Sequence, residues 1–249
     1  METNAFELSE GGTVADDFPV VFALFPRVTQ LDFTGPHEVL RRLPGARCIL
    51  ASSLGGDLES DGGLTFTRVT RLADIERCAL ICVPGGSGTI EAMEDQELLA
   101  QLRRLAKTAR YVTSVCTGAL VLGAAGLLHG KRATSHWASR DALAAFGALS
   151  DSARVVRDGS VFTGGGVTAG IDLALTVLAE VAGDDFAQAV QLGIEYAPVP
   201  PFNSGRPELA PAHIVAQMQQ RHERARAVRD AAVLRAAARL RPDNGTNAM

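Results

Sequence analysis

The stretch VTSVCTGALVLGAAG, residues 112–126, combines a strand, a sharp turn and a helix, and it determines the fold that we predict for the chain. A β-branched run leads to Cys116, and the small residues Thr117 and Gly118 open an almost wholly apolar helix. In a tight strand-to-helix turn, the side chain of the residue at the turn projects at the carboxyl edge of the sheet, as in a nucleophile elbow. The nearby helix N-terminus favours a thiolate and lowers the pKa of a thiol. We therefore predict that Cys116 is a nucleophile with a lowered thiol pKa, and that the backbone N–H of Thr117 stabilises developing negative charge.

The other three cysteines carry no comparable signal. Cys48, Cys78 and Cys82 form no CxxC pair, and the last two lie in or beside an apolar run. We interpret them as buried, reduced structural thiols, which is also the alternative interpretation of Cys116. No group of His and Cys residues has the spacing of zinc ligands, so we expect no metal site.

Outside the turn, short apolar runs alternate with longer helical patterns, which is typical of βαβ units around a mostly parallel sheet. Within the first predicted helix Thr34 is the expected N-cap with Pro36 in the first turn, and Gly183 ends a later helix. The pair Asp158-Gly159 between two apolar runs predicts a hairpin. The predicted strands are 19–25, 46–52, 64–70, 78–84 and 111–116, and the predicted helices are 34–43, 90–109, 117–128, 167–183 and 187–196.

Two further loops are expected at the same edge of the sheet as the cysteine. PGGSG, residues 84–88, follows a buried strand, and the backbone N–H groups of Gly85 and Gly86 could complete an oxyanion hole with Thr117. Asp32 lies just past the first strand, where its carboxylate could face the sulfur of Cys116. The alternatives are an ordinary glycine turn for 84–88 and a solvated or helix-capping acid for Asp32.

The ends of the chain differ in composition from its middle. Residues 1–18 form an acidic, Gly-containing stretch that we expect to be a flexible tail, without the charged and apolar regions of a signal peptide. A Pro-rich segment at 197–211 precedes one long helical pattern at 211–241, in which residues 221–241 hold seven arginines against two acids. A run of about 18 apolar residues, which a membrane span needs, does not occur. With a formal net charge of −4, we expect a cytoplasmic protein without a nucleic-acid or membrane partner.

Three motifs that occur in order resemble the ThiJ/PfpI superfamily: LDFTGPHEV near the start, then PGG, then VTSVCTGALVLGAAGLL. The resemblance covers residues 19–203. It implies a flavodoxin-like three-layer α/β sandwich with a nucleophile elbow, a catalytic domain over 19–203, and a homodimer that a helical arm over 204–249 braces.

Within the superfamily the chain is similar to the branch that hydrates isonitriles to N-formamides, on RATSHW (132–137), TGGGVTAGIDLAL (163–175) and EYAPVPPFNSGRP (195–207). This similarity implies a covalent thioimidate on Cys116, Asp32 as general acid and base, Thr117 and the Gly85-Gly86 backbone as positioning groups, and no cofactor. It places Thr168 at the N-terminus of a helix near the pocket.

The chain departs from other branches at two positions. Proteolytic members carry His directly after the nucleophile, where this chain has Thr117, and many relatives carry Glu where it has Asp32. Peptide hydrolysis by a Cys–His pair is therefore disfavoured. We expect His136 to be a surface or helix-capping residue and Trp137 to pack in the core.

Two rival functions remain on the sequence alone. AraC-type regulators carry similar ligand-sensing domains, with CTGA and a His-Trp pair, before a DNA-binding region; here one helix follows instead of two helix-turn-helix units. The second rival is a redox or glyoxalase-like stress protein that uses a reactive Cys116.

Overall fold

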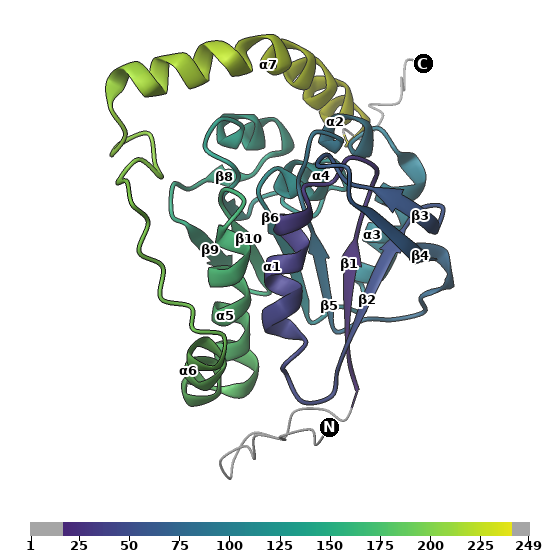
Figure 1. Cartoon of the computed structure of the whole chain (residues 1–249). Helices are drawn as coiled ribbons and strands as arrows, with labels where there is room; N and C mark the ends of the chain where they lie inside the picture. Colours follow the sequence, from purple (N-terminus) through teal and green to yellow (C-terminus); the bar gives the residue numbers. More distant parts are fainter. Residues whose placement is uncertain (1–16, 241–249) are drawn as a thin grey trace, which may run out of the picture.

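The computed structural model describes residues 17–240, so most of the predicted tail at 1–18 lies outside the described residues. An eight-stranded sheet runs in the order β3-β4-β2-β1-β5-β6-β10-β9 (Figure 1). Its strands are β1 (Phe18–Ala23), β2 (Ala46–Ser52), β3 (Gly56–Glu59), β4 (Thr65–Arg71), β5 (Leu80–Val83), β6 (Tyr111–Val115), β9 (Val155–Asp158) and β10 (Val161–Gly164). The helices are α1 (Gln30–Leu40), α2 (Thr89–Ala92), α3 (Gln96–Ala106), α4 (Gly118–Ala124), α5 (Ala169–Ala182), α6 (Asp184–Gly193) and α7 (Ala212–Leu240).

The sheet is mostly parallel, as predicted. The pairs β4–β2, β2–β1, β1–β5, β5–β6 and β6–β10 are parallel, and antiparallel pairing occurs at the two edges, between β3 and β4 and between β9 and β10. Parallel strands end at one edge of a sheet, so the turns after β1, β5 and β6 are neighbours in space. The predicted α/β class and flavodoxin-like sandwich are confirmed.

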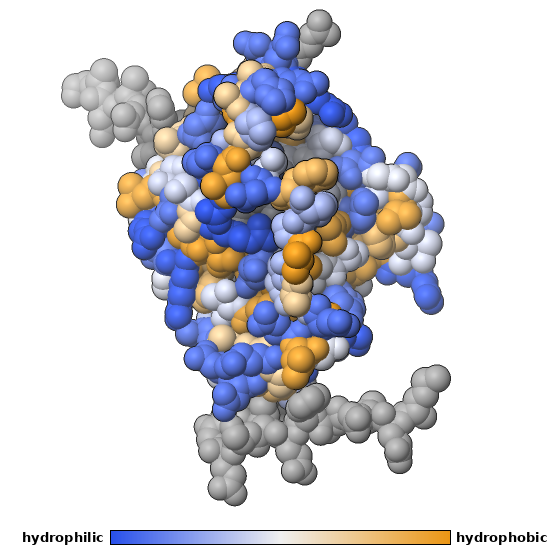
Figure 2. Space-filling view, turned by 60° about the vertical axis from the view of Figure 1, so that its left-hand side comes forward, coloured by the Kyte–Doolittle hydropathy of each residue, from blue (hydrophilic) through white to orange (hydrophobic). Residues whose placement is uncertain are grey.

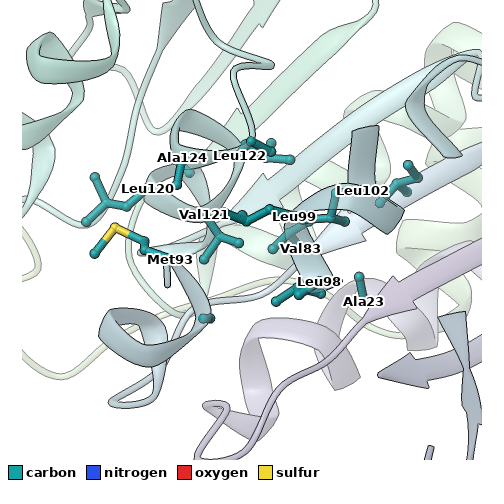
Figure 3. Close-up of a cluster of buried hydrophobic side chains, with 14 of the residues drawn as sticks. Ala23, Val83, Met93, Leu98, Leu99, Leu102, Leu120, Val121, Leu122 and Ala124 are labelled. Atoms are coloured by element: carbon teal, nitrogen blue, oxygen red, sulfur yellow. The ribbon is translucent and has the colours of Figure 1, made fainter. Parts of the chain in front are cut away.

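Two apolar cores lie on opposite faces of the sheet. Along β1, Val21 and Ala23 belong to one core while Val20 and Phe22 belong to the other, because successive side chains of a strand point to opposite faces. Side chains of α2, α3, α4 and α7 join the first core, and those of α1, α5 and α6 join the second. Figure 3 shows part of the first core, where Leu99 of α3 lies beside Val121 of α4 and Val83 of β5. Every residue of α4 is buried, as its apolar sequence predicts.

The start of α1 differs from the prediction. The helix begins at Gln30, four residues before the expected N-cap Thr34, whose hydroxyl instead donates to the carbonyl of Gln30 at 2.9 Å. Thr29 occupies the N-cap position, and its carbonyl accepts the N–H of Asp32 at 3.1 Å. Asp32 therefore lies in the first turn of a helix, and Pro36 lies inside it.

The predicted helix at 90–109 is divided in two. Asp95 accepts the N–H of Leu98 at 3.0 Å and so caps a new helix, α3, while α2 before it has only four residues. A capping aspartate competes with continuation of the preceding helix, which explains the break. Met93, Leu98 and Leu102, three large apolar side chains of this segment, are fully buried.

Several smaller elements were predicted or missed for clear reasons. The hairpin at Asp158-Gly159 is confirmed between β9 and β10, and Gly183 ends α5 with a positive φ of 87°. The sequence patterns miss the short β3, the two-residue strands β7 (Arg132–Ala133) and β8 (Leu149–Ser150), and the 3₁₀ helices η1 (Leu72–Asp74) and η2 (Arg140–Phe146), because elements of this length carry too little periodicity.

The long helix α7 matches the predicted pattern at 211–241 closely. Its second half packs on the domain, where Ala232, Val233 and Ala236 are buried in the core beside α4. Arg229 is also buried there, donating to the carbonyl of Ala138 and, at 2.9 Å, to the hydroxyl of Ser139. None of the helices in the described part of the chain is long and apolar enough to span a bilayer.

Candidate active site

The turn after β6 holds Cys116 in a strained conformation. Its φ is 57°, in the left-handed region that residues other than glycine rarely occupy. Its N–H donates to the carbonyls of Gly164 (3.1 Å) and Gly165 (2.7 Å), and the hydroxyl of Ser135 donates to its carbonyl at 2.9 Å. Gly118 lies against the end of β5, since a Cβ there would clash with the carbonyl oxygen of Val83 and lie 2.7 Å from that of Pro84. The backbone around the sulfur is thus fixed from three directions, as in a nucleophile elbow.

The carboxyl of Asp32 is completely buried beside this turn. Its Oδ2 accepts the N–H of Gly85 at 2.8 Å, and its Oδ1 has no hydrogen-bond partner among the described residues. Burial raises the pKa of Asp32 to about 7, although the hydrogen bonds of Gly85 and the thiol of Cys116 oppose the rise. The charge of Asp61 nearby adds a smaller upward contribution. Near neutral pH this carboxyl can both accept and donate a proton.

The pKa of the Cys116 thiol is raised well above its usual value, which is opposite to the shift that the sequence predicts. Cys116 is only 7% exposed, and burial is the largest cause of the rise in its pKa, followed by the negative charge of Asp32. The N–H of Thr117 lowers the pKa, as expected for the start of a helix, but α4 is only seven residues long and burial outweighs it. A thiolate at Cys116 is therefore disfavoured while the neighbouring carboxyl of Asp32 is charged.

The two predicted loop glycines do reach this site. A Cβ on Gly85 would lie 2.6 Å from the nitrogen of Thr117 and 2.9 Å from Oδ2 of Asp32, so only glycine fits between these two residues. The N–H of Gly85 donates to Asp32, and the N–H of Gly86 donates to the hydroxyl of Thr117 at 3.1 Å. Both groups that we predicted as oxyanion donors thus already have acceptors, and the N–H of Thr117 is the donor that faces the sulfur.

Thr89, at the start of α2, is a site residue that the sequence did not reveal. Its hydroxyl lies 2.7 Å from that of Thr117 and donates to the carbonyl of Gly86 at 2.8 Å. It is 3% exposed. A threonine after a glycine-rich loop is usually a helix-start residue, so only its position beside Thr117 indicates another role.

Thr168 lies in a cavity that adjoins the turn on another side. The cavity has a volume of about 250 Å³, and its walls include Ser135 and Gly165, two of the residues that bond to the backbone of Cys116. Thr168 is exposed there, and its hydroxyl accepts a hydrogen bond from Arg154 at 3.1 Å. Its predicted place at the start of α5 is confirmed, while its role in substrate binding stays a prediction.

His136 and Trp137 line the same cavity. His136 is half-buried, and its Nδ1 accepts the N–H of Ala138 at 3.3 Å within a turn, rather than capping a helix or lying on the surface. Burial, with the nearby His222 of α7, lowers the pKa of His136. Trp137 is only half-buried and packs against both histidines, so the prediction of a core residue is wrong: cavities surround its ring. Over residues 17–240, the His, Cys, Asp and Glu side chains do not gather in threes as a metal site would require.

Comparisons with known proteins agree with this geometry. The model of the DJ-1/PfpI family matches residues 19–180. The chain is 51% identical to an isonitrile hydratase of Pseudomonas putida over 88% of this chain and 96% of that one. It also resembles the crystal structure of a ThiJ/PfpI family protein from Pseudomonas syringae, with a TM-score of 0.85 and 40% identity over 87% of this chain and 90% of that one. A transcriptional regulator of Rhizobium meliloti, GlxA, is 34% identical over 55% of this chain and 43% of its own length.

Proposed function

The chain belongs to the DJ-1/PfpI family, and from this premise we propose that it is an isonitrile hydratase that uses Cys116 as nucleophile and Asp32 as general acid and base. One observation carries the proposal: a buried carboxyl with a pKa of about 7 interacts with a strained, buried thiol. The 51% identity to an isonitrile hydratase over nearly the whole of both chains selects the substrate class.

In the first step the proton of the thiol passes to Asp32 and the thiolate attacks the terminal carbon of the isonitrile. Asp32 returns the proton to that carbon, so the group R–N≡C becomes the thioimidate R–N=CH–S on Cys116. A pKa near 7 suits this exchange, because neither form of the carboxyl is strongly favoured at neutral pH.

In the second step water replaces the sulfur. Asp32 takes a proton from a water molecule as the water oxygen attacks the thioimidate carbon, and passes that proton to the nitrogen. The hydroxyl of the adduct then gives its proton to Asp32 as the carbon–sulfur bond breaks, which releases the N-formamide R–NH–CHO, and Asp32 returns this proton to the thiolate. The sum is one isonitrile plus one water, so no cofactor takes part.

The arrangement of hydrogen-bond donors suits an isonitrile substrate better than an amide substrate. Hydrolysis of an amide develops charge on a carbonyl oxygen and needs donors aimed at that oxygen. Here the N–H groups of Gly85 and Gly86 hold Asp32 and the hydroxyl of Thr117 in place. An isonitrile has no carbonyl oxygen, and its reacting carbon needs a proton instead. A carboxyl supplies that proton, and the position after the cysteine is Thr117 rather than His.

The proposal includes a cytoplasmic homodimer that the arm over 204–249 braces. Its support is the face that carries the Pro-rich segment, where apolar patches interrupt the hydrophilic surface in Figure 2. Val199, Phe202 and Leu209 are exposed in this segment, with Phe202 at 78%. Light scattering on the purified chain should give twice its mass of 26.2 kDa, and a monomer at micromolar concentration would remove this part of the proposal.

The test of the activity is incubation of the protein with one aryl and one alkyl isonitrile. We expect the matching N-formamide, detected by mass spectrometry, from the native chain and none from Cys116→Ala. Methylglyoxal in a parallel reaction tests the glyoxalase-like rival, and a salt-dependent gel shift with DNA tests the regulator. Loss of isonitrile without formamide, or formamide from both chains, would contradict the proposal.

A further inference from the structure

Three hydrogen bonds around Thr117 close into a ring. The N–H of Gly86 donates to Oγ1 of Thr117 (3.1 Å), the hydroxyls of Thr117 and Thr89 are 2.7 Å apart, and Thr89 donates to the carbonyl of Gly86 (2.8 Å). Each hydroxyl has one proton to give. Because Thr89 gives its proton to Gly86, the contact between the two hydroxyls must be a donation from Thr117 to Thr89. The ring thus directs the hydroxyl proton of Thr117 away from the sulfur that precedes it.

The hydroxyl of Thr117 has a second possible acceptor. It lies close enough to Cys116 for its hydrogen bond to lower the pKa of that thiol, together with the bond from its own N–H. One proton cannot serve Thr89 and the sulfur at full strength at once. The structure has the ring closed, and a second arrangement can form if the hydroxyl turns from Thr89 to a thiolate.

We propose that Thr89 is a positioning residue that holds the Thr117 hydroxyl in the ring while Cys116 is protonated and releases it when the thiolate forms. The inference rests on the proposed role of Cys116 as nucleophile. Thr89 acts through Thr117 and competes with the sulfur for one proton, so its hydroxyl sets how easily the nucleophile ionises.

Helix capping does not account for the Thr89 hydroxyl. A capping hydroxyl accepts a backbone N–H of the helix that it begins. The hydroxyl of Thr89 instead contacts one side chain and one carbonyl that lie outside α2, while its backbone N–H and carbonyl already bond to Gly86 and Met93. Its methyl group and burial would be preserved by valine, which has the same shape.

The ionisation of Cys116 also depends on the charges around it. Among the described residues, Asp32 of α1 is the charged group that acts on this thiol, and Asp61 acts on Asp32 from the loop after β3. Cys82 of β5 is neutral, because burial raises the pKa of its thiol to about 12. Thr89 is uncharged, so a variant at this position leaves these electrostatic contributions in place.

The experiment is a titration of the Cys116 thiolate by its ultraviolet absorbance, taken as the difference between each chain and its Cys116→Ala counterpart. Thr89→Val removes the competing acceptor, so we expect a thiolate that forms at lower pH. Alkylation by iodoacetamide below the thiol pKa should then be about 5-fold faster, the factor that one hydrogen bond of ordinary strength represents. Thr89→Ser keeps the hydroxyl and should titrate like the native chain.

The same change in a Thr117→Val background separates this role from a structural one. Without the Thr117 hydroxyl there is no proton to compete for, so Thr89→Val should then leave the titration unchanged. The proposal is overturned if Thr89→Val titrates like the native chain. It is also overturned if Thr89→Val shifts the pKa of the Cys116 thiol equally with threonine and with valine at position 117. Thr89→Ala removes the same hydroxyl if valine prevents folding. The readout does not use an isonitrile, so it stands or fails separately from the proposed activity.

Discussion

Two turns of this molecule place a residue in the same unusual backbone conformation with different side chains. In the hairpin between β9 and β10, Gly159 has a φ of 61°, and a Cβ there would meet nothing within 4 Å. After β6, Cys116 has a φ of 57° and carries a side chain. Glycine adopts this conformation freely, whereas other residues lose about 1–2 kcal/mol. Glycine therefore favours the backbone conformation of the hairpin, whereas cysteine disfavours the conformation of the turn after β6.

The difference shows that the fold tolerates destabilising features at the turn after β6. The hydrogen bonds from Cys116 to Gly164 and Gly165 and from Ser135 hold the strained backbone, and the sulfur is held beside a second unfavourable group, the buried carboxyl of Asp32. Strain and buried charge together are typical of functional sites. The hairpin has neither, so substitutions at the two turns should separate activity from stability.

The largest expected effect is the loss of turnover when the sulfur is removed. Cys116→Ala and Cys116→Ser should both lose more than the roughly 10⁴-fold that general acid–base catalysis alone contributes, because the covalent route disappears. Formamide production by purified variants measures it. Cys48→Ala is the matched control and should keep native activity, because Cys48 lies on β2, apart from Asp32 and the turn after β6. A serine variant with more than one hundredth of native turnover would remove the covalent scheme.

A smaller loss of rate is expected when the carboxyl is replaced. Asp32→Asn keeps an acceptor for the N–H of Gly85 but cannot move a proton, so turnover should fall roughly 10²- to 10⁴-fold. The pH profile of the native enzyme should show an inflection near the pKa of about 7 that the variant lacks. The same inflection in both proteins would show that another group is responsible.

The same replacement should make the protein more stable at neutral and alkaline pH. The pKa of Asp32 is about 7 when folded against 3.8 as the ordinary value, so the folded state keeps a proton that the unfolded state releases in this window. Native stability therefore falls as the pH rises from about 4 to about 7, by up to about 4 kcal/mol at 1.4 kcal/mol per pKa unit. Urea unfolding at pH 5 and pH 8 measures it. Asp32→Asn should lose less stability between the two pH values, and equal losses would contradict the buried, shifted carboxyl.

The smallest expected effect compares the two turns directly. Gly159→Ala should lower stability by about 1–2 kcal/mol and leave activity unchanged, and Cys116→Gly should be more stable than Cys116→Ala by a similar amount. The exposed Gly193, whose φ is not positive, is the control, and Gly193→Ala should not destabilise the chain. Thermal unfolding of the four variants measures the differences. If alanine were as stable as glycine at position 116, the strain at the turn would be absent.

The elements that local sequence determines were predictable. The strand at 46–52, the hairpin at Asp158-Gly159 and the helix stop at Gly183 all follow from apolar runs and glycines within a few residues. The turn at Cys116 follows from the same kind of signal, since a β-branched run, small residues and an apolar helix are adjacent in the chain.

The chemistry of the site depends on distant parts of the chain, and there prediction failed. The predicted direction of the shift in the thiol pKa is wrong, because burial raises the pKa more than the helix start beside the cysteine lowers it. Burial depends on the whole fold. The contact between Thr89 and Thr117 joins residues 28 positions apart. Asp32 was placed correctly near the edge of the sheet, but its helix begins earlier than the nearest threonine suggests.

The position of Trp137 gives the molecule a built-in optical reporter. It is the only tryptophan of the chain, and its ring lies 6.0 Å from that of His222 on α7 and 5.6 Å from that of His136, which follows the residue bonded to the carbonyl of Cys116. Movement of the C-terminal helix would change the polarity around a single indole and so its emission wavelength. Fluorescence can therefore follow the attachment of this helix in the native chain, without any dye or label.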